Sequence, residues 1–384
     1  MPWKDKTVEE LRKEFAESAK ACENFSALCR EYGITRATGY KWVERYEKTG
    51  NLSDRSHVPY TVPGRTSPEI EELIVNLRLD NPGWGGKKIL QVLRNQGYEN
   101  LPCERTAGNI LKRHNCISPE ESLKHKAFKR FQREKCNELW QTDFKGDFAL
   151  LNGERCYPLD ILDDCSRFCL KLEAKSRPHG INESFEETFR EFGMPNSILS
   201  DNGPQFSGFR GGYTQFERWL MDLDIAPIHG RIIHPQTQGK IERFHRSMNE
   251  ELLKHNKFFD IDEAATALNC WHEKYNNIRP HEALGMKCPA DIYIPSERKF
   301  PEIIKDYEYC GIYRLIKVNN WGYLRFDKIS VFLSETMADT KVEIRPAEDD
   351  CFEVYYRNFR IAVIDAHEKK LINRHIARTE SPSV

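Results

Sequence analysis

Residues 198–253 read ILSDNGPQFSGFRGGYTQFERWLMDLDIAPIHGRIIHPQTQGKIERFHRSMNEELL, and the rest of the chain can be organised around them. An apolar run ends at Asp201, and an amphipathic segment that begins with glycine carries Glu242. Upstream, the strand-like stretch LWQTDFKGDF at 139–148 contains Asp143. Three carboxylates on three separate elements predict a single metal site.

The surroundings of each acid support this prediction. Asp143 lies mid-strand among apolar neighbours, where an unpaired charge is costly to bury, so it needs a cation or hydrogen bonds. Asp201 ends a strand, the place where α/β sheets assemble their sites. Helical periodicity puts Glu242 on one polar face with His245, Arg246 and Asn249.

The chemistry of such a cluster favours a divalent cation. Two carboxylates about 4 Å apart repel by roughly 4 kcal/mol at an effective dielectric constant of about 20, and a cation removes that conflict. Oxygen ligands favour Mg²⁺, or Mn²⁺ as a substitute, over zinc. A pair of such ions can stabilise both the attacking and the leaving oxygen of a phosphodiester displacement. The alternative is that these are three unrelated acids among the 59 in the chain.

The N-terminal residues 1–52 have the pattern of a helix-turn-helix DNA-binding domain. A helix in FSALCRE is followed by a turn at Gly33 and by a second helix capped by Thr35. Side chains in the first turns of such a second helix reach bases or phosphates, and here they are Thr35, Arg36, Thr38, Lys41 and Arg45. An ordinary helical hairpin with a solvated charged face is the alternative.

A proline-rich linker at 53–66 leads to a second helix-turn-helix-like domain at 67–116 and a basic linker at 117–137. Arg55 and Arg65 in the first linker could lie in a minor groove or in a solvated connector. In the basic linker, Lys129, Arg130 and Arg133 could follow a phosphate backbone, although a simple connector is also possible.

The remaining sequence predicts two further domains. Strand-like runs followed by alternating helices and strands at 138–295 indicate an α/β core with a mixed sheet. Residues 296–384 contain short β-branched and aromatic runs separated by turns, which favour a small SH3-like β-barrel. The expected fold class is therefore multidomain α+β, with helical units before the α/β core. The barrel could serve DNA binding or have a purely structural role.

Composition sets bounds on these interpretations. The net charge is −1 over 384 residues, so no global basic field announces a polyanionic partner, although residues 1–135 hold 25 Lys and Arg against 19 Asp and Glu. The 12 cysteines are scattered, which is typical of reduced thiols. No apolar run approaches the ~18 residues of a membrane helix. We therefore expect a cytoplasmic protein with no membrane partner.

Three segments, DFKGDF, LSDNGPQF and HPQTQGKIERFHR, resemble the signature segments of the DDE transposases and retroviral-type integrases. The similarity is greatest to bacterial insertion-sequence transposases of the IS481 and IS3 type, and the tandem helix-turn-helix units and YNNIRPHEALG also fit them. The resemblance implies an RNase H-like catalytic core. It also implies that Asp143, Asp201 and Glu242 are catalytic and bind two Mg²⁺ ions, with Asp143 shared between them.

Two features depart from that family. Asp201 and Glu242 are separated by 40 residues, more than is usual, and the glycine-rich SGFRGGYTQ can house the excess in a loop. The family usually has Lys or Arg two helical turns after its Glu, where this chain has Asn249. Asn249 can still bind a phosphate or a base, Arg246 could supply the charge, and Lys240 could contact DNA.

The resemblance implies a bacterial, nucleoid-associated transposase. Such an enzyme would nick transposon ends and join the freed 3′-hydroxyl to target DNA. Its partners would be double-stranded DNA, both the terminal inverted repeats and the target, and further copies of the chain in a homo-oligomer. Two alternatives remain open from the residues alone. One is a catalytically silent DNA-binding regulator, and the other is a metal-dependent nuclease that cuts without joining.

Overall fold

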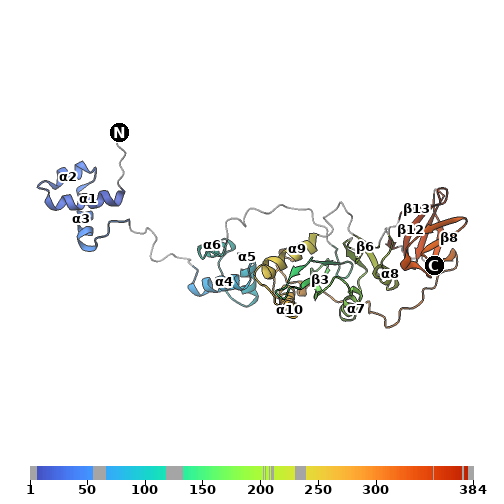
Figure 1. The fold of residues 1–384 in the computed structure, drawn as a ribbon. Coiled ribbons are helices and arrows are strands. Elements are labelled where there is room, and N and C mark those ends of the chain that lie inside the picture. Colours follow the sequence, from blue (N-terminus) through green and yellow to red (C-terminus); the bar gives the residue numbers. More distant parts are fainter. Residues whose placement is uncertain are drawn as a thin grey trace. The chain divides into compact units, whose positions relative to one another are not determined.

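The computed structural model describes residues 7–54, 66–117, 133–201, 203, 205–206, 208, 212–229, 239–348, 350–373 and 376–378 (Figure 1). The chain divides into two compact units, residues 1–65 and residues 66–384.

The first unit is a small bundle of three helices. They are α1 (Val8–Ala21), α2 (Phe25–Glu31) and α3 (Arg36–Thr49). Gly33 has a left-handed φ of 65°, which allows the tight turn between α2 and α3. The Thr35 side chain caps α3 by accepting a hydrogen bond from the backbone N–H of Thr38. The predicted helix-turn-helix layout is therefore confirmed for this region.

The second unit begins with three further helices. They are α4 (Pro68–Asp80), α5 (Gly86–Asn95) and α6 (Glu104–Arg113). Ser67 caps α4, and Pro68 occupies the first helical position, where its missing N–H costs nothing. The three helices share a core around Trp84, Leu90 and Leu111.

The centre of the second unit is a mixed sheet with strand order β4-β3-β1-β5-β6, to which the short β2 adds at β3. Strands β1, β3 and β4 pair antiparallel, while β1, β5 and β6 pair parallel. This agrees with the predicted α/β core. The strands are β1 (Trp140–Phe144), β2 (Phe148–Ala149), β3 (Arg155–Asp163), β4 (Cys169–Lys175), β5 (Ser197–Ser200) and β6 (Ala226–His229).

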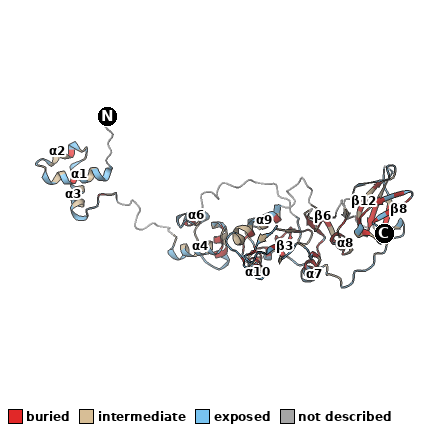
Figure 2. Cartoon of the chain, in the orientation of Figure 1, coloured by how far each residue is buried: buried red, intermediate tan, exposed pale blue. Residues whose placement is uncertain are grey.

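Helices cover both faces of this sheet. Trp140 and Ile161 pack with α7 (Ile181–Phe192) and α8 (Gln215–Asp222) on one face. Leu162 and Leu172 pack with α9 (Gly239–Met248) and α10 (Ile261–Asn277) on the other. Figure 2 shows the buried residues concentrated in these strands and in the C-terminal strands. Because side chains alternate along a strand, successive residues of a strand face opposite helical layers.

The helix that carries Glu242 is shorter than its periodicity predicts. It ends at Met248 and continues as a π-helical turn, Asn249–Leu253, in which the Lys254 N–H donates to the Asn249 carbonyl at 3.0 Å. The wider turn places Glu251 against Arg279, with Nε and Oε1 2.8 Å apart. This buried ion pair explains why the helix leaves α-geometry there.

The C-terminal region forms a separate β layer. A sheet of order β13-β12-β11-β10-β7, with β14 paired to β12, lies beside a two-stranded ribbon of β8 and β9. Among the described strands no backbone pairing joins the ribbon to the sheet, so a closed SH3-like barrel is not confirmed. The strands are β7 (Arg314–Lys317), β8 (Tyr323–Phe326), β9 (Ile329–Phe332), β10 (Lys341–Pro346), β11 (Cys351–Tyr356), β12 (Phe359–Asp365), β13 (Lys370–Asn373) and β14 (Ala377–Arg378).

Three short helical turns complete the second unit: Glu282–Leu284, Pro289–Asp291 and Glu335–Met337. In the described part of the chain, no helix has the length and apolarity needed to cross a membrane.

Candidate active site

Asp143 lies on β1 and faces the layer of α9 and α10. Its neighbour Phe144 and, three residues earlier, Trp140 pack against the opposite layer of α7 and α8, so alternation directs Asp143 to the α9 side. Burial and, to a smaller extent, the nearby carboxylates of Asp160 and Asp201 raise the pKa of Asp143 to about 7. An acid so perturbed inside a sheet is typical of a functional site.

Asp201 follows β5 directly and lies beside Asp143. Strand β5 pairs parallel with β1 in the register Trp140↔Ile198 and Gln141↔Leu199. Continuing this register by two residues puts the two aspartates at the same strand end. The backbone N–H of Gly203 donates to Oδ1 of Asp201 at 2.9 Å and so fixes that carboxylate at the start of the turn.

Glu242 is on the first turn of α9 and its side chain is exposed. Helix α9 contacts β1, the strand of Asp143. The preceding residues 230–238 lie outside the described residues. The structure thus brings the helix of Glu242 to the strand of Asp143, and Glu242 itself remains open to solvent.

A fourth acid, Asp160, belongs to the same region and was missed by the sequence analysis. It is fully buried on β3, opposite Asp143 in the antiparallel register. His245 of α9 reaches it, with Nε2 2.7 Å from Oδ2. Burial lowers the pKa of His245, but the Asp160 carboxylate outweighs this and the net pKa is raised. The pair fixes α9 to the sheet one turn beyond Glu242.

The sequence did contain a signal for Asp160. It is an ionisable residue inside the apolar run YPLDIL, where only a paired charge is tolerated.

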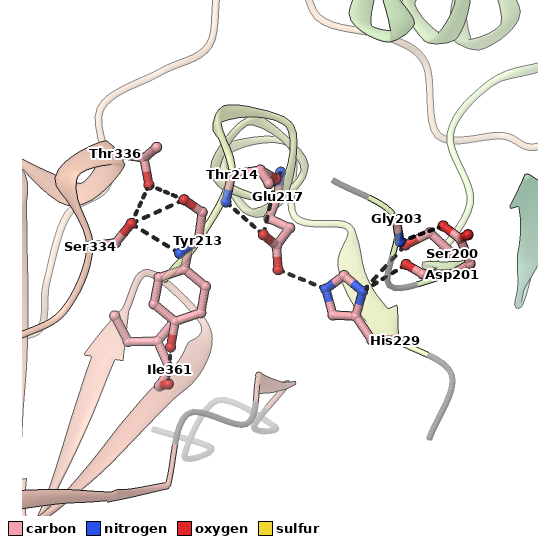
Figure 3. A network of polar contacts seen from close by, with 10 residues as sticks. All are labelled: Ser200, Asp201, Gly203, Tyr213, Thr214, Glu217, His229, Ser334, Thr336 and Ile361. Atoms are coloured by element: carbon pink, nitrogen blue, oxygen red, sulfur yellow. Dashed lines mark hydrogen bonds and ion pairs between the residues drawn. The ribbon is translucent and has the colours of Figure 1, made fainter. Parts of the chain in front are cut away.

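A second missed group lies behind Asp201 (Figure 3). His229, the last residue of β6, has Nδ1 3.4 Å from the carbonyl oxygen of Asp201. Its Nε2 lies 2.8 Å from Oε1 of Glu217, a buried residue of α8. Burial lowers the pKa of His229, whereas the hydrogen bond and the negative charge of Glu217 raise it. The net pKa is raised above its ordinary value. No spacing rule connects residues 201, 217 and 229, and the sequence analysis did not consider this contact.

The donor chemistry of the site fits a divalent cation. Asp143 and Asp201 are neighbouring, partly buried carboxylates, and Asp143 is hard to ionise, which is the situation that a bound cation relieves. Among the residues that the structure describes, no three Asp, Glu, His or Cys side chains already form a compact ligand set. Glu242 would therefore have to turn inward to complete the predicted triad.

Other candidate acids have structural partners. Asp163 accepts hydrogen bonds from the backbone N–H groups of Asn137 and Ser166. Asp164 pairs with Lys240, whose side chain is only 12% exposed. A contact between Lys240 and DNA would require this buried ion pair to break.

The remaining predicted DNA contacts differ in exposure. Arg36 and Lys41 are exposed on α3, whereas Thr35 and Thr38 are joined through their hydroxyls at 2.8 Å. Arg45 is half-buried, with its guanidinium over the Trp42 ring at 5.3 Å. Elsewhere, Arg246 is exposed, Asn249 begins the π-helical turn and Arg133 is exposed. Four candidates lie outside the described residues: Arg55, Arg65, Lys129 and Arg130.

Models of known protein families match three stretches of this chain. The integrase core domain matches residues 133–235, and a second integrase core model matches residues 223–289. A homeodomain-like domain matches residues 38–111. The two core models together span the sheet, α7 to α10, and all three predicted catalytic acids.

Curated relatives come from bacterial insertion elements. An uncharacterized protein of insertion element IS476 from Xanthomonas euvesicatoria is 29% identical over 40% of this chain and 43% of its own length. An uncharacterized protein of insertion element IS407 from Burkholderia multivorans is 26% identical over 40% of this chain and 54% of its length. The chain thus spans about half the length of these relatives.

A further relative is matched over a longer stretch. The transposase InsD for insertion element IS2 from Escherichia coli is 27% identical over 59% of this chain and 81% of its length. The family matches and the insertion-element relatives agree with the fold of the core. They also agree with the two aspartates at neighbouring strand ends. These matches support the resemblance of the chain to the DDE transposases and retroviral-type integrases, and residues 133–289 match integrase core domains.

Proposed function

We propose that this protein is a DNA transposase that cuts the ends of a mobile element and joins them to target DNA. The observation that carries the proposal is the placement of Asp143 and Asp201 at adjacent strand ends, with the helix of Glu242 fixed beside them by His245 and Asp160. The integrase core and insertion-element relatives support it.

The reaction has two displacements at phosphorus. Water attacks the phosphodiester at the end of the element, breaks the bond to the 3′ oxygen and leaves a free 3′-hydroxyl. That hydroxyl then attacks a target phosphodiester, forms a new bond to phosphorus and releases a target 3′-hydroxyl. The number of phosphodiester bonds is conserved in the second step.

Asp143, Asp201 and Glu242 would hold two Mg²⁺ ions, for which Mn²⁺ could substitute. When bound, such ions activate the nucleophile and stabilise charge on the leaving oxygen. The chain's own residues prepare the site for them. The Gly203 N–H orients Asp201, and the His245–Asp160 pair holds α9 against the strand of Asp143.

The helical domains would bind double-stranded DNA, with Arg36 and Lys41 of α3 as the exposed candidates. Arg133, Arg246 and Asn249 would contribute near the core, and Thr35, Thr38, Arg45 and Lys240 are weaker candidates because their side chains already have partners in the protein. Joining two ends to one target requires more than one active site, so a homo-oligomer on DNA follows. Its substrates would be terminal inverted repeats and target DNA, in the cytoplasm at the bacterial nucleoid.

A strand-transfer assay with an oligonucleotide that carries the element's end tests this function. The purified protein is incubated with labelled end DNA, target plasmid and Mg²⁺. Joined product supports the transposase. Cut product without joining supports the nuclease, and end binding without either supports the silent regulator.

Single substitutions test the triad. Asp143→Asn, Asp201→Asn and Glu242→Gln should each reduce joining by at least about 100-fold, because even residues that merely support metal ligands contribute 10- to 100-fold. The matched control is Asp147→Asn, an acid on the same hairpin that is ion-paired with Arg155. If the three variants join as well as the control, the triad assignment is wrong.

A further inference from the structure

Tyr213 lies between Asp201 and helix α8 in the chain, but its side chain packs in the C-terminal β domain. It is 4% exposed and packs in the hydrophobic core of that domain. Its backbone N–H donates to Oγ of Ser334 at 2.9 Å, and its carbonyl accepts from Oγ1 of Thr336 at 2.7 Å. Its hydroxyl donates to the carbonyl of Ile361 on β12. Tyr213 is therefore bound at its backbone and at its side-chain tip.

Helix α8 follows directly, with Thr214 as its N-cap, and is held by the same domain. Arg218 donates to the Thr336 carbonyl at 2.7 Å. Asp222 accepts from the Tyr356 hydroxyl at 2.6 Å and pairs with Arg357 at 2.8 Å. On its other side α8 packs into the core of the central sheet through Phe216 and Leu220. The helix is thus shared between the catalytic core and the C-terminal domain.

The first turn of α8 connects this attachment to Asp201. Thr214 and Glu217 form a capping box, in which the Thr214 N–H donates to Oε2 of Glu217 at 2.6 Å. The other oxygen of Glu217 lies 2.8 Å from Nε2 of His229. Nδ1 of His229 lies 3.4 Å both from the Asp201 carbonyl oxygen and from Oγ of Ser200. Figure 3 shows these polar contacts in two groups, one around Tyr213 and one from Thr214 to Asp201, which the peptide bond between Tyr213 and Thr214 connects.

Burial makes the series hard to rearrange. Glu217 is 3% exposed, and its carboxylate is satisfied by Thr214 and His229. Removing one partner leaves a buried acceptor unsatisfied, which costs more than an ordinary hydrogen bond contributes. A shift of Tyr213 would therefore be passed to Glu217 and His229 rather than absorbed locally.

We propose that the C-terminal β domain positions Asp201, with Tyr213 fixing the start of α8 and with Glu217 and His229 transmitting that position to the Asp201 peptide. All three are positioning residues and touch no reacting atom. This gives the C-terminal domain a role in building the active site, separate from any contact with DNA. The inference rests on the proposed function only in taking Asp201 as a metal ligand.

The test removes the attachment from the side of the C-terminal domain. The double variant Ser334→Ala/Thr336→Val deletes the hydroxyls that bind the Tyr213 backbone and leaves the core of the domain intact. The matched control is Ser330→Ala, an exposed serine on β9 of the same domain. Three quantities are measured in the full chain: Mn²⁺ affinity, backbone amide hydrogen exchange at residues 197–201, and strand transfer.

The double variant should bind Mn²⁺ roughly tenfold more weakly, as is usual when support of a metal ligand is lost. Amide exchange at the end of β5 should become faster, and end binding in a gel-shift assay should stay at the level of the control. Unchanged Mn²⁺ affinity and unchanged exchange would overturn the proposal.

A second variant, His229→Gln, keeps the proposal testable if the C-terminal domain of the double variant misfolds. It acts at the Asp201 end of the series and should give the same loss of Mn²⁺ affinity with circular dichroism unchanged. If His229→Gln weakens Mn²⁺ binding and a folded Ser334→Ala/Thr336→Val does not, the role of the C-terminal domain is refuted. If both variants bind Mn²⁺ more weakly than the wild type, as expected, but the wild-type chain never joins DNA, the positioning stands and the transposase function fails.

Discussion

His245 lies with its Nε2 2.7 Å from Oδ2 of Asp160, and this contact helps to join the helix of Glu242 to the strand beside Asp143. Asp160 is fully buried, so its charge depends on the imidazole for compensation. The functional elements of the core are thus held together by a residue pair that is not itself among the predicted metal ligands.

Substitution of His245 should therefore destabilise the core. His245→Ala leaves Asp160 buried without its partner, a change that typically costs about 3–5 kcal/mol. Urea denaturation followed by fluorescence measures the loss. The control is Arg246→Ala, the next residue on the same helix, which is exposed and should change stability by less than about 0.5 kcal/mol. Equal stability of the two variants would contradict the role given to the pair.

Two helix glycines should respond in opposite directions to alanine. A Cβ on Gly39 of α3 would lie 2.8 Å from Sγ of Cys29 and 2.9 Å from Cζ of Phe15, so Gly39→Ala should destabilise by about 1–3 kcal/mol through overpacking. A Cβ on Gly108 of α6 meets no atom within 4 Å, so Gly108→Ala should stabilise by about 0.5–1 kcal/mol through helix propensity.

Thermal unfolding of the two variants checks the sign of each change. A stabilised Gly39→Ala would show that the bundle of α1 to α3 relaxes around the added methyl group.

DNA binding should depend on the exposed cations at the start of α3. Arg36→Ala and Lys41→Ala should each weaken binding to the end of the element, and each should reduce the slope of log K against log salt by about 1 if the side chain contacts a phosphate. Lys48→Ala is the control, because Lys48 is exposed at the far end of the same helix and paired with Glu44. Fluorescence anisotropy at several salt concentrations measures both quantities. An equal effect of all three substitutions would show that DNA does not bind at the start of α3.

Acid should destabilise the core through His281. Burial and, to a smaller extent, the cations Arg279, Lys88 and Arg167 lower the pKa of His281 to about 2. Nη1 of Arg279 lies 3.4 Å from Nε2 of His281, which favours a neutral, accepting ring. In the unfolded chain the ring protonates near pH 6.5. The contribution is therefore fully present above pH 6.5 and is lost as the pH falls below that value.

The expected slope is up to about 1.4 kcal/mol per pH unit between pH 6.5 and pH 4, because one proton is taken up on unfolding. The difference in unfolding free energy between wild type and His281→Gln isolates this part from the carboxyl groups. A difference that does not change with pH over this range would contradict a neutral His281.

Local patterns in the sequence were sufficient to predict several features. Turn glycines, caps and periodicity located the helix-turn-helix, including Gly33 and the cap at Thr35. Local patterns placed Asp143 within one strand and Asp201 at the end of another, and the structure makes these strands neighbours and brings the two acids together. Such features depend on residues within one or two turns of each other, so the sequence alone carries them.

Other features depend on residues that are far apart in the chain. Asp160 contacts His245, and Tyr213 packs in the core of the C-terminal strands, which lie much later in the chain. Glu251 in the π-helical turn pairs with Arg279 of a later segment. The backbone pairing that leaves the C-terminal strands as an open sheet and a ribbon is also of this kind. The sequence by itself predicted most element types and the candidate acids, because these depend on local patterns. Only the tertiary structure decided which side chains support those acids, because burial and long-range contact set the energy of each charge.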